Sequence, residues 1–265
     1  ALIAYNMSKE TGYELTRNGV TYIFTFNKNE AGDMTYAKTE NFNICVERFA
    51  HMWHFLGEIE NQFRYVIVTD VKDVVFQKNP SVWLSRADNP MIVGSENLRY
   101  VDEPWSRNNM KVAFGPGIFE TMRNQPIYCA GVIAGTQNQL SDLFMNIYLL
   151  CRGCPAHIAG GGGPDQSAMN ILLSLSAYST VEKLTPLDAF VFHAGTSREA
   201  VKAGSGAIGE SYLRDPGVLD IYDNTLLYAD AVWKNGQVCT VYDDPYCIVH
   251  QYDRVPEWRK IIEDT

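Results

Sequence analysis

Apolar, β-branched runs that end in polar residues recur along the chain and predict its strands. The run from Tyr65 to Val68 is typical of a buried parallel strand, and it is followed by two acids, Asp70 and Asp73. A second apolar run, Val74–Phe76, comes directly after them. We therefore expect both carboxylates at the carboxyl edge of a strand, which is where open α/β sheets bind their ligands.

Strands and helices alternate along the rest of the chain. Further β-branched and aromatic runs predict strands at Val20–Phe26, Met91–Val93, Ile127–Thr136, Leu187–Phe192 and just before His250. Helical spacing of apolar residues and helix-start signals predict helices at Cys45–Leu56, Ser81–Arg86, Leu140–Cys151, from Asp165 and from Pro256. This order predicts an α/β fold with a mostly parallel central sheet flanked by helices.

One stretch interrupts this alternation. Residues Asn97–Phe119 are rich in polar and aromatic side chains, which predicts a long irregular loop that binds a ligand. Tyr100 and Trp105 in this loop are candidates to stack on a sugar or a nucleobase, although filling a small apolar cluster is an equal alternative. Glu96 comes just before the loop, and we expect the preceding strand to deliver it to the same edge of the sheet.

Length and charge narrow the class of protein. With 265 residues, 46% of them hydrophobic, the chain can bury one large core, which favours a single domain over residues 1–265. The net charge of −9 argues against a nucleic-acid-binding surface. No apolar run reaches the roughly 18 residues of a membrane span, and the first residues are too short an apolar segment for a signal peptide. We expect a cytoplasmic location, with the Golgi lumen as the alternative if an N-terminal anchor was removed.

Six cysteines are spread along the chain, at positions 45, 129, 151, 154, 239 and 247. Cys151 and Cys154 are the only close pair and have no second pair or histidine pair nearby, which argues against a zinc site. We expect buried free thiols, and a disulfide between Cys239 and Cys247 is the main alternative.

Asp70 and Asp73, with Lys72 between them, form a candidate metal site. Carboxylate oxygens suit Mg²⁺ or Mn²⁺, which bind through a few carboxylates together with substrate phosphates. The alternative is structural: Asp70 ends the strand as a turn former and Asp73 caps the next segment. Arg48 lies off the apolar stripe of its predicted helix, so it either faces solvent or reaches a diphosphate.

The acidic segment resembles the metal and sugar-nucleotide site of GT-A fold glycosyltransferases. It has Asp-x-x-Asp, one residue longer than the usual motif of that fold. Ile127–Thr136, with Gly131 inside it, looks like the strand beneath the donor sugar, and Cys129 stands where that strand usually has Asn. Asp165-Gln166-x-x-x-Asn170, after the glycines Gly160–Gly163, resembles the Asp-Gln helix start of retaining members. His250, in His-Gln-Tyr-Asp-Arg, looks like the C-terminal metal ligand.

This resemblance implies a role for each candidate residue in transferring a sugar from a nucleotide-sugar donor, most commonly a UDP-sugar, to a glycan or other hydroxyl acceptor. Residues 1–125 would form mainly the nucleotide and metal half and residues 126–265 mainly the sugar and acceptor half, with retention of the anomeric configuration slightly favoured. The implied metal ligands for Mn²⁺ or Mg²⁺ are Asp70, Asp73 and His250, and the phosphate contacts are Lys72, Arg254 and Arg48. Asp165 and Gln166 would be catalytic, with Gly131, Glu96, Tyr100 and Trp105 near the sugar or the acceptor.

Two other functions are open at this point. A non-catalytic carbohydrate-binding protein would use Trp105, Tyr100 and the acids with Ca²⁺, and it would bind glycans without nucleotides. A metal-dependent nucleotidyltransferase would usually carry a glycine-rich, basic loop near its N-terminus, and none is visible before Tyr65. Asp165 also has a purely structural explanation, because a carboxylate at a helix start is favourable for the helix itself.

Overall fold

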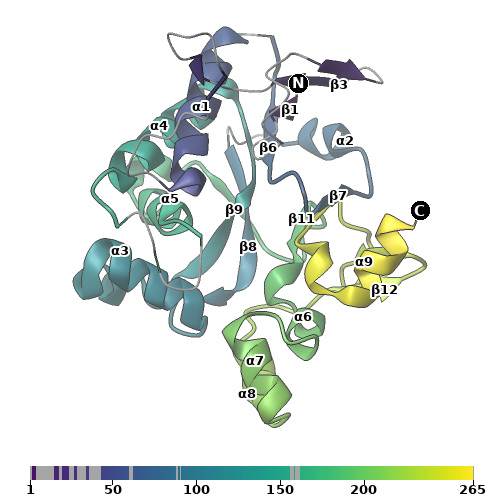
Figure 1. Ribbon diagram of the computed structural model, residues 1–265. Helices are drawn as coiled ribbons and strands as arrows, with labels where there is room; N and C mark the ends of the chain where they lie inside the picture. The colour runs from purple at the N-terminus through teal and green to yellow at the C-terminus, as the bar shows by residue number, and fades with distance from the viewer. Residues whose placement is uncertain are drawn as a thin grey trace.

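The computed structural model of the chain describes residues 2–3, 15–17, 20–23, 27–28, 34–35, 43–59, 62–87, 89, 91–155, 158 and 162–264 (Figure 1). Side chains are described from residue 43 onward, Ile44 excepted. The first part of the chain contributes short strands: β1 (Leu2–Ile3), β2 (Leu15–Arg17), β3 (Val20–Ile23), β4 (Asn27–Lys28) and β5 (Met34–Thr35). β3 confirms the start of the strand predicted at Val20–Phe26, whose last three residues lie outside the described ranges.

The central sheet has four strands in the order β10-β8-β9-β6. Their bounds are β6 (Val66–Thr69), β8 (Met91–Arg99), β9 (Pro126–Gly135) and β10 (Glu182–Leu184). β10 is parallel to β8, but β8 and β6 both run antiparallel to β9. The fold is therefore mixed α/β, and the expectation of a mostly parallel central sheet with a parallel strand at residues 65–68 is wrong. An apolar run indicates a strand but not the direction of its neighbour, and β6 is a half-buried edge strand rather than the buried one expected.

A second, three-stranded sheet lies beside the central one. It has the order β11-β14-β7, formed by β7 (Val74–Phe76), β11 (Val191–His193) and β14 (Ile248–His250). β11 is parallel to β14, and β14 is antiparallel to β7. Because β6 belongs to the central sheet and β7 to the second sheet, the chain crosses from one sheet to the other between Thr69 and Val74.

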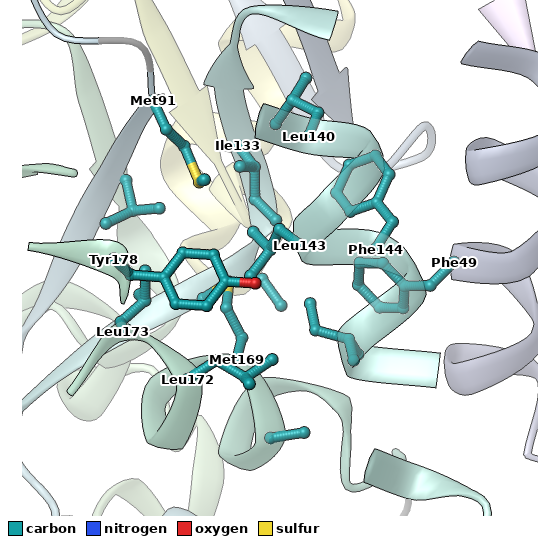
Figure 2. Packing of buried hydrophobic residues seen from close by; sticks show 14 of the residues in the cluster. Phe49, Met91, Ile133, Leu140, Leu143, Phe144, Met169, Leu172, Leu173 and Tyr178 are labelled. Atoms are coloured by element: carbon teal, nitrogen blue, oxygen red, sulfur yellow. The ribbon is translucent and has the colours of Figure 1, made fainter. Parts of the chain in front are cut away.

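Helices cover the opposite face of the central sheet. Figure 1 shows α1 (Ile44–Glu58), α4 (Gln137–Cys151) and α5 (Asp165–Leu173) on one side of β8 and β9, with β7 and β11 on the other. Strand residues alternate accordingly: Met91 and Val93 pack in a core with these helices, whereas Ile92 packs against residues of the second sheet. Figure 2 shows the helix-side core, in which the Phe49 and Phe144 rings lie 5.3 Å apart.

The segment predicted as an irregular loop at Asn97–Phe119 is mostly regular, which is a second correction. β8 continues to Arg99, and α3 runs from Pro104 to Met122 with a break at Gly115, where φ is 86°. Glu103 caps this helix, since its carboxylate accepts hydrogen bonds from the backbone N–H groups of residues 105 and 106, and Pro104 occupies a first-turn position. Its apolar pattern is weak because polar residues such as Asn109 are buried in it, so periodicity could not identify it.

The remaining helices and strands follow in chain order. The helices are α2 (Pro80–Leu84), α6 (Arg198–Lys202), α7 (Gly206–Arg214), α8 (Val218–Asp223) and α9 (Pro256–Glu263), and the short 3₁₀ turns are Ser176–Tyr178, Ala194–Thr196 and Tyr252–Arg254. β12 (Val232–Lys234) and β13 (Gln237–Cys239) form an antiparallel hairpin. The predicted helices from Asp165 and Pro256 are confirmed, whereas the strand expected at Leu187–Phe192 is only the short β11.

All six cysteines are free thiols, so the alternative of a Cys239–Cys247 disulfide is wrong. Four of them are buried, and Cys45 and Cys154 are partly exposed. Among the helices of the described residues, none combines the length and the apolar character that a membrane crossing requires.

Candidate metal and ligand site

The turn between β6 and β7 carries both predicted acids and is fixed by its backbone. Asp70 follows the last residue of β6, and its N–H donates to the carbonyl of Gly131 on β9 at 2.8 Å. Asp73 precedes β7, and its carbonyl accepts from the N–H of Gln251 at 2.6 Å. The backbone of Asp70 is thus hydrogen-bonded to the central sheet and that of Asp73 to the residue after β14. These two bonds fix the turn between the sheets and with it the positions of the two carboxylates.

His250 brings the third candidate ligand to the same place. It is the last residue of β14 and is only 1% exposed, and it pairs with Val74, the residue after Asp73. Its Nε2 lies 3.3 Å from Oδ2 of Asp70 and 3.8 Å from Oδ1 of Asp73, yet this buried nitrogen makes no hydrogen bond of acceptable geometry. Two carboxylates and an unpaired imidazole nitrogen therefore converge on one point.

Two glycines make room for buried histidines between the sheets. A Cβ added at Gly131 on β9 would lie only 2.6 Å from Nε2 of His250, and one at Gly94 on β8 would lie 2.8 Å from Nε2 of His193. Real Cβ atoms do not approach that closely, so any side chain at residue 131 would displace the His250 imidazole. Gly131 is therefore required by the packing of this histidine, which gives the glycine inside the predicted strand a physical reason.

These three side chains fit a divalent cation. One ligand atom from each of Asp70, Asp73 and His250 lies within 4.8 Å of the other two, and carboxylate oxygen and imidazole nitrogen are both ligands of divalent cations. The position of Nε2 supports this fit, because this buried nitrogen faces the Asp70 and Asp73 carboxylates and makes no hydrogen bond of acceptable geometry to either.

The charges of the two acids respond to different neighbours. Burial would raise the pKa of Asp70, but His250 and Arg48 outweigh it and hold this pKa below its ordinary value. Burial raises the pKa of Asp73, and His250 opposes that rise only in part. Asp70 is therefore the more firmly ionised of the two in the absence of a cation.

Arg48 links this cluster to Asp165. One guanidinium nitrogen contacts Oδ1 of Asp70, and another lies 2.9 Å from Oδ2 of Asp165, the first residue of α5. Arg48 therefore does not lie on a solvated helix face. Burial raises the pKa of Asp165, which is 5% exposed, and the adjacent Arg48 opposes this rise. The N-cap of α5 is Pro164, so Asp165 is not itself the cap residue.

A cavity of about 500 Å³ opens beside these groups. Among the predicted site residues, those that line it are Arg48, Asp70, Asp73, Glu96, Trp105, Gly131, Asp165, Gln166, His250 and Arg254. The described part of the glycine run, Gly162 and Gly163, also lines it, while Gly160 and Gly161 lie outside the described residues. The cavity thus gathers residues from segments that are far apart in sequence.

Two predicted residues lie elsewhere. Tyr100 is fully buried in an apolar cluster with Leu98 and Met110 and does not line the cavity, so the structure places it in the core rather than against a ligand. Lys72 is exposed in the turn between the two acids and does not line the cavity either.

Gln166 and Glu96 form a polar wall of the cavity. The Gln166 amide oxygen accepts from the N–H of Ala130 at 3.2 Å, and its nitrogen donates to Oε1 of Glu96 at 3.2 Å. Burial, together with the nearby Glu103 carboxylate, raises the pKa of Glu96 to about 7. At neutral pH this wall therefore carries a carboxyl group that exchanges a proton readily.

Sequence reasoning missed several residues of the site. His193, 2% exposed, pairs with His250 in register, and their Nδ1 atoms lie 3.0 Å apart. Burial, reinforced by His250, lowers the pKa of His193 well below its ordinary value, so its ring is neutral. One signal could have found it: β11 and β14 each consist of two apolar residues followed by histidine.

Glu103 and Gln251, which also line the cavity, were missed as well. Glu103 stood in a segment expected to be irregular, and its cap position is visible only once α3 is recognised. Gln251 adopts a left-handed backbone conformation, with φ of 60°, and follows the candidate ligand His250 directly. Nothing in the residue type of either position signalled a cavity wall.

Comparison with known proteins adds no assignment to this geometry, since neither a family model nor a curated protein sequence matches the chain.

Proposed function

We propose that this protein is a glycosyltransferase with a GT-A-like fold, which moves a sugar from a nucleotide-sugar donor, in the first place a UDP-sugar, to a glycan or other hydroxyl acceptor with Mn²⁺ or Mg²⁺. The observation that carries this proposal is the convergence of Asp70, Asp73 and His250 at the wall of a cavity that also contains the Arg48–Asp165 pair. The cavity volume of about 500 Å³ suits a small-molecule ligand.

Charge balance supports a cation as part of ligand binding. The described residues that line the cavity include five acids, at 70, 73, 96, 103 and 165, against two arginines, at 48 and 254. A diphosphate would be repelled by such a wall unless a cation lay between them. When bound, the cation would neutralise charge on the diphosphate leaving group and act as a Lewis acid.

Arg48 and Asp165 supply the chain's own contribution beside that point. Because Arg48 contacts both Asp70 and Asp165, it holds the helix start of α5 at a fixed distance from the candidate ligands. The carboxylate of Asp165 is proposed to stabilise positive charge on the transferred sugar, or, in an inverting reaction, to accept the proton of the acceptor hydroxyl. Hydrogen bonds to Ala130 and Glu96 fix the Gln166 amide in the cavity wall, where it is proposed to face the sugar hydroxyls.

Trp105 and Arg254 give the proposed ligand two further contacts. The Trp105 ring lies close to Gly162, where an added Cβ would be 2.9 Å from the ring, so the ring packs over the glycine run at the cavity wall. A partly exposed aromatic face in this position suits a sugar ring or a base. Arg254 is an exposed cation at the cavity and suits a phosphate oxygen.

The test is turnover with a panel of UDP- and GDP-sugars, with and without Mn²⁺, measured as release of the nucleoside diphosphate in the presence of mixed glycan acceptors. The proposal predicts release only with Mn²⁺ or Mg²⁺ and its loss in Asp73→Asn and His250→Ala. Asp220→Asn, an exposed acid on α8 that does not line the cavity, is the matched control and should keep wild-type turnover. Glycan binding without nucleotide binding would instead identify a carbohydrate-binding protein.

A further inference from the structure

His193 stands directly behind the candidate metal ligand His250. The two rings meet edge to face with their Nδ1 atoms 3.0 Å apart, while the Nε2 of His250 points to the carboxylates of Asp70 and Asp73 on the other side. The imidazole of His250 therefore has one nitrogen for a cation and one for a hydrogen bond to His193.

Proton placement follows from this contact. At 3.0 Å one Nδ1 must carry a hydrogen and the other must offer a lone pair, and a histidine binds a cation only through a ring nitrogen that carries no hydrogen. If the hydrogen were on His193, His250 would carry its own hydrogen on Nε2 and could not bind a cation there. If the hydrogen is on Nδ1 of His250, its Nε2 presents a lone pair to the point where Asp70 and Asp73 converge.

We propose that His193 is a positioning residue that accepts a hydrogen bond from Nδ1–H of His250 and so fixes the tautomer and the ring orientation in which His250 binds the divalent cation. This inference rests on the proposed metal-dependent function. His193 suits the role because it is buried and belongs to the adjacent strand in register with His250. Among the ion pairs of the described residues, none involves His193, so no carboxylate competes for its ring.

The neighbouring thiol is a weaker candidate for the same hydrogen bond. Sγ of Cys129 lies 3.5 Å from Nδ1 of His250, and sulfur is a poor acceptor beside an imidazole nitrogen. Ligand atoms of Cys129, His193 and His250 also lie within 4.8 Å of one another, so these three could hold a metal ion of their own, in which case Nδ1 of His250 would bind that ion instead. The experiment must therefore separate a hydrogen bond from a thiolate–histidine metal site.

The first measurement compares the affinity for Mn²⁺, by calorimetry, in the wild type, His193→Asn and His193→Leu. The amide oxygen of Asn replaces the Nδ1 acceptor, whereas Leu fills the buried space without an acceptor. We expect His193→Leu to weaken Mn²⁺ binding by about 10–100-fold and His193→Asn to restore most of it. A role in packing alone predicts the opposite order, because Leu suits this apolar site better than Asn, and that order would overturn the inference.

The second measurement needs no variant. In Mg²⁺-loaded protein labelled with ¹⁵N-histidine, NMR should show a coupling through the hydrogen bond between the two Nδ1 atoms, with the proton of His193 on Nε2. A proton on Nδ1 of His193 would overturn the inference. Loading with Co²⁺ should give no sulfur-to-cobalt charge-transfer absorption, and its appearance would identify the soft site at Cys129 instead.

Failure of the inference and failure of the proposed function give different results. If the wild type binds Mn²⁺ and His193→Leu binds it equally well, only the role of His193 is wrong. If the wild type binds neither Mn²⁺ nor Mg²⁺, the proposed metal site itself is wrong.

Discussion

Gly131 and the His250 imidazole occupy adjoining space where the two sheets meet, and the ligand geometry depends on that fit. Gly131→Ala would place a Cβ 2.6 Å from Nε2 and even closer to Cε1 of His250, so the ring must move. We expect a loss of about 1–3 kcal/mol in the free energy of unfolding, measured with urea, together with weaker Mn²⁺ binding.

Gly57→Ala is the matched control for that substitution. Nothing lies within 4 Å of a Cβ at Gly57, which is in the last turn of α1. Alanine is the better helix former, so this variant should gain up to about 1 kcal/mol in stability and bind Mn²⁺ as the wild type does. Equal Mn²⁺ affinity in both alanine variants would contradict the role assigned to Gly131.

Glu96 gives the site a pH dependence whose sign can be derived. Its pKa rises from an ordinary 4.5 to about 7 because burial and Glu103 disfavour the carboxylate. Between these two pH values the folded state holds a proton that the unfolded state releases. The contribution of Glu96 to the free energy of unfolding is therefore complete below pH 4.5 and is lost as the pH rises to about 7. Glu96→Gln should abolish this fall in the free energy of unfolding with pH, which amounts to on the order of 3 kcal/mol over that interval.

The measurement for Glu96 is urea unfolding from pH 4.5 to 7.5 with a chelator present. An unchanged slope in Glu96→Gln would mean that Glu96 is ionised in the folded protein across this range. Glu257→Gln, at an exposed position in the first turn of α9, serves as the control and should leave the slope unaltered.

At the scale of secondary-structure elements, Arg48 joins α1 to α5 and to the turn after β6. Arg48→Met removes the cation from Asp165, which is 5% exposed, and we expect a loss of about 3 kcal/mol in the free energy of unfolding. Without Arg48 the Asp165 carboxyl is neutral at low pH and becomes an unpaired buried charge at higher pH. The loss in the free energy of unfolding relative to wild type should therefore grow as the pH rises above about 4.

Urea unfolding at two pH values, near 4 and near 7, measures this change. Arg86→Met, at an exposed position just after α2, is the control and should change stability by less than about 0.5 kcal/mol. A pH-independent deficit in Arg48→Met would show that the pair with Asp165 does not account for the loss.

Elements with a continuous apolar run were predictable, and those built on polar contacts were not. β6, β9 and α4 have the expected type and nearly the expected bounds because each consists mainly of apolar residues, although β6, expected to be a buried strand, is only half-buried. α3 was not predictable, since Glu103 caps it and Asn109 donates to the carbonyl of Gly163 from inside it. Strand direction was also missed, because it depends on which neighbour a strand pairs with.

The same distinction applies to the site. Asp70, Asp73, Asp165 and His250 could be proposed from the sequence because each follows or begins a predictable element, and the structure brings Asp70, Asp73 and His250 together. His193 was missed because its partner His250 lies 57 positions away in the chain, and the two become neighbours only through the pairing of β11 with β14 in the second sheet. For Tyr100 the sequence left a ligand contact and an apolar cluster equally open, because an aromatic residue in a polar segment gives no sign of whether it faces a cavity or the core. The structure places it in the buried cluster.

At the scale of the whole molecule, the candidate site lies where the central sheet and the second sheet meet. The turn from β6 to β7 crosses between them, and β14 and α5 bring their residues to that crossing. Excess negative charge at this point leads to the central claim, that the cavity binds a nucleoside diphosphate only together with a divalent cation.

Calorimetric titration with UDP and with GDP, each with and without Mn²⁺, tests that claim most directly, with thermal unfolding of the same samples as a second readout. We expect binding of one nucleotide only when Mn²⁺ is present, with a stabilisation of about 2.7 kcal/mol at a nucleotide concentration 100 times its Kd. Asp73→Asn should lose this response, and Asp220→Asn should keep it. Binding of equal strength without the metal, or no binding of any nucleoside diphosphate with Mn²⁺ present, would contradict the account.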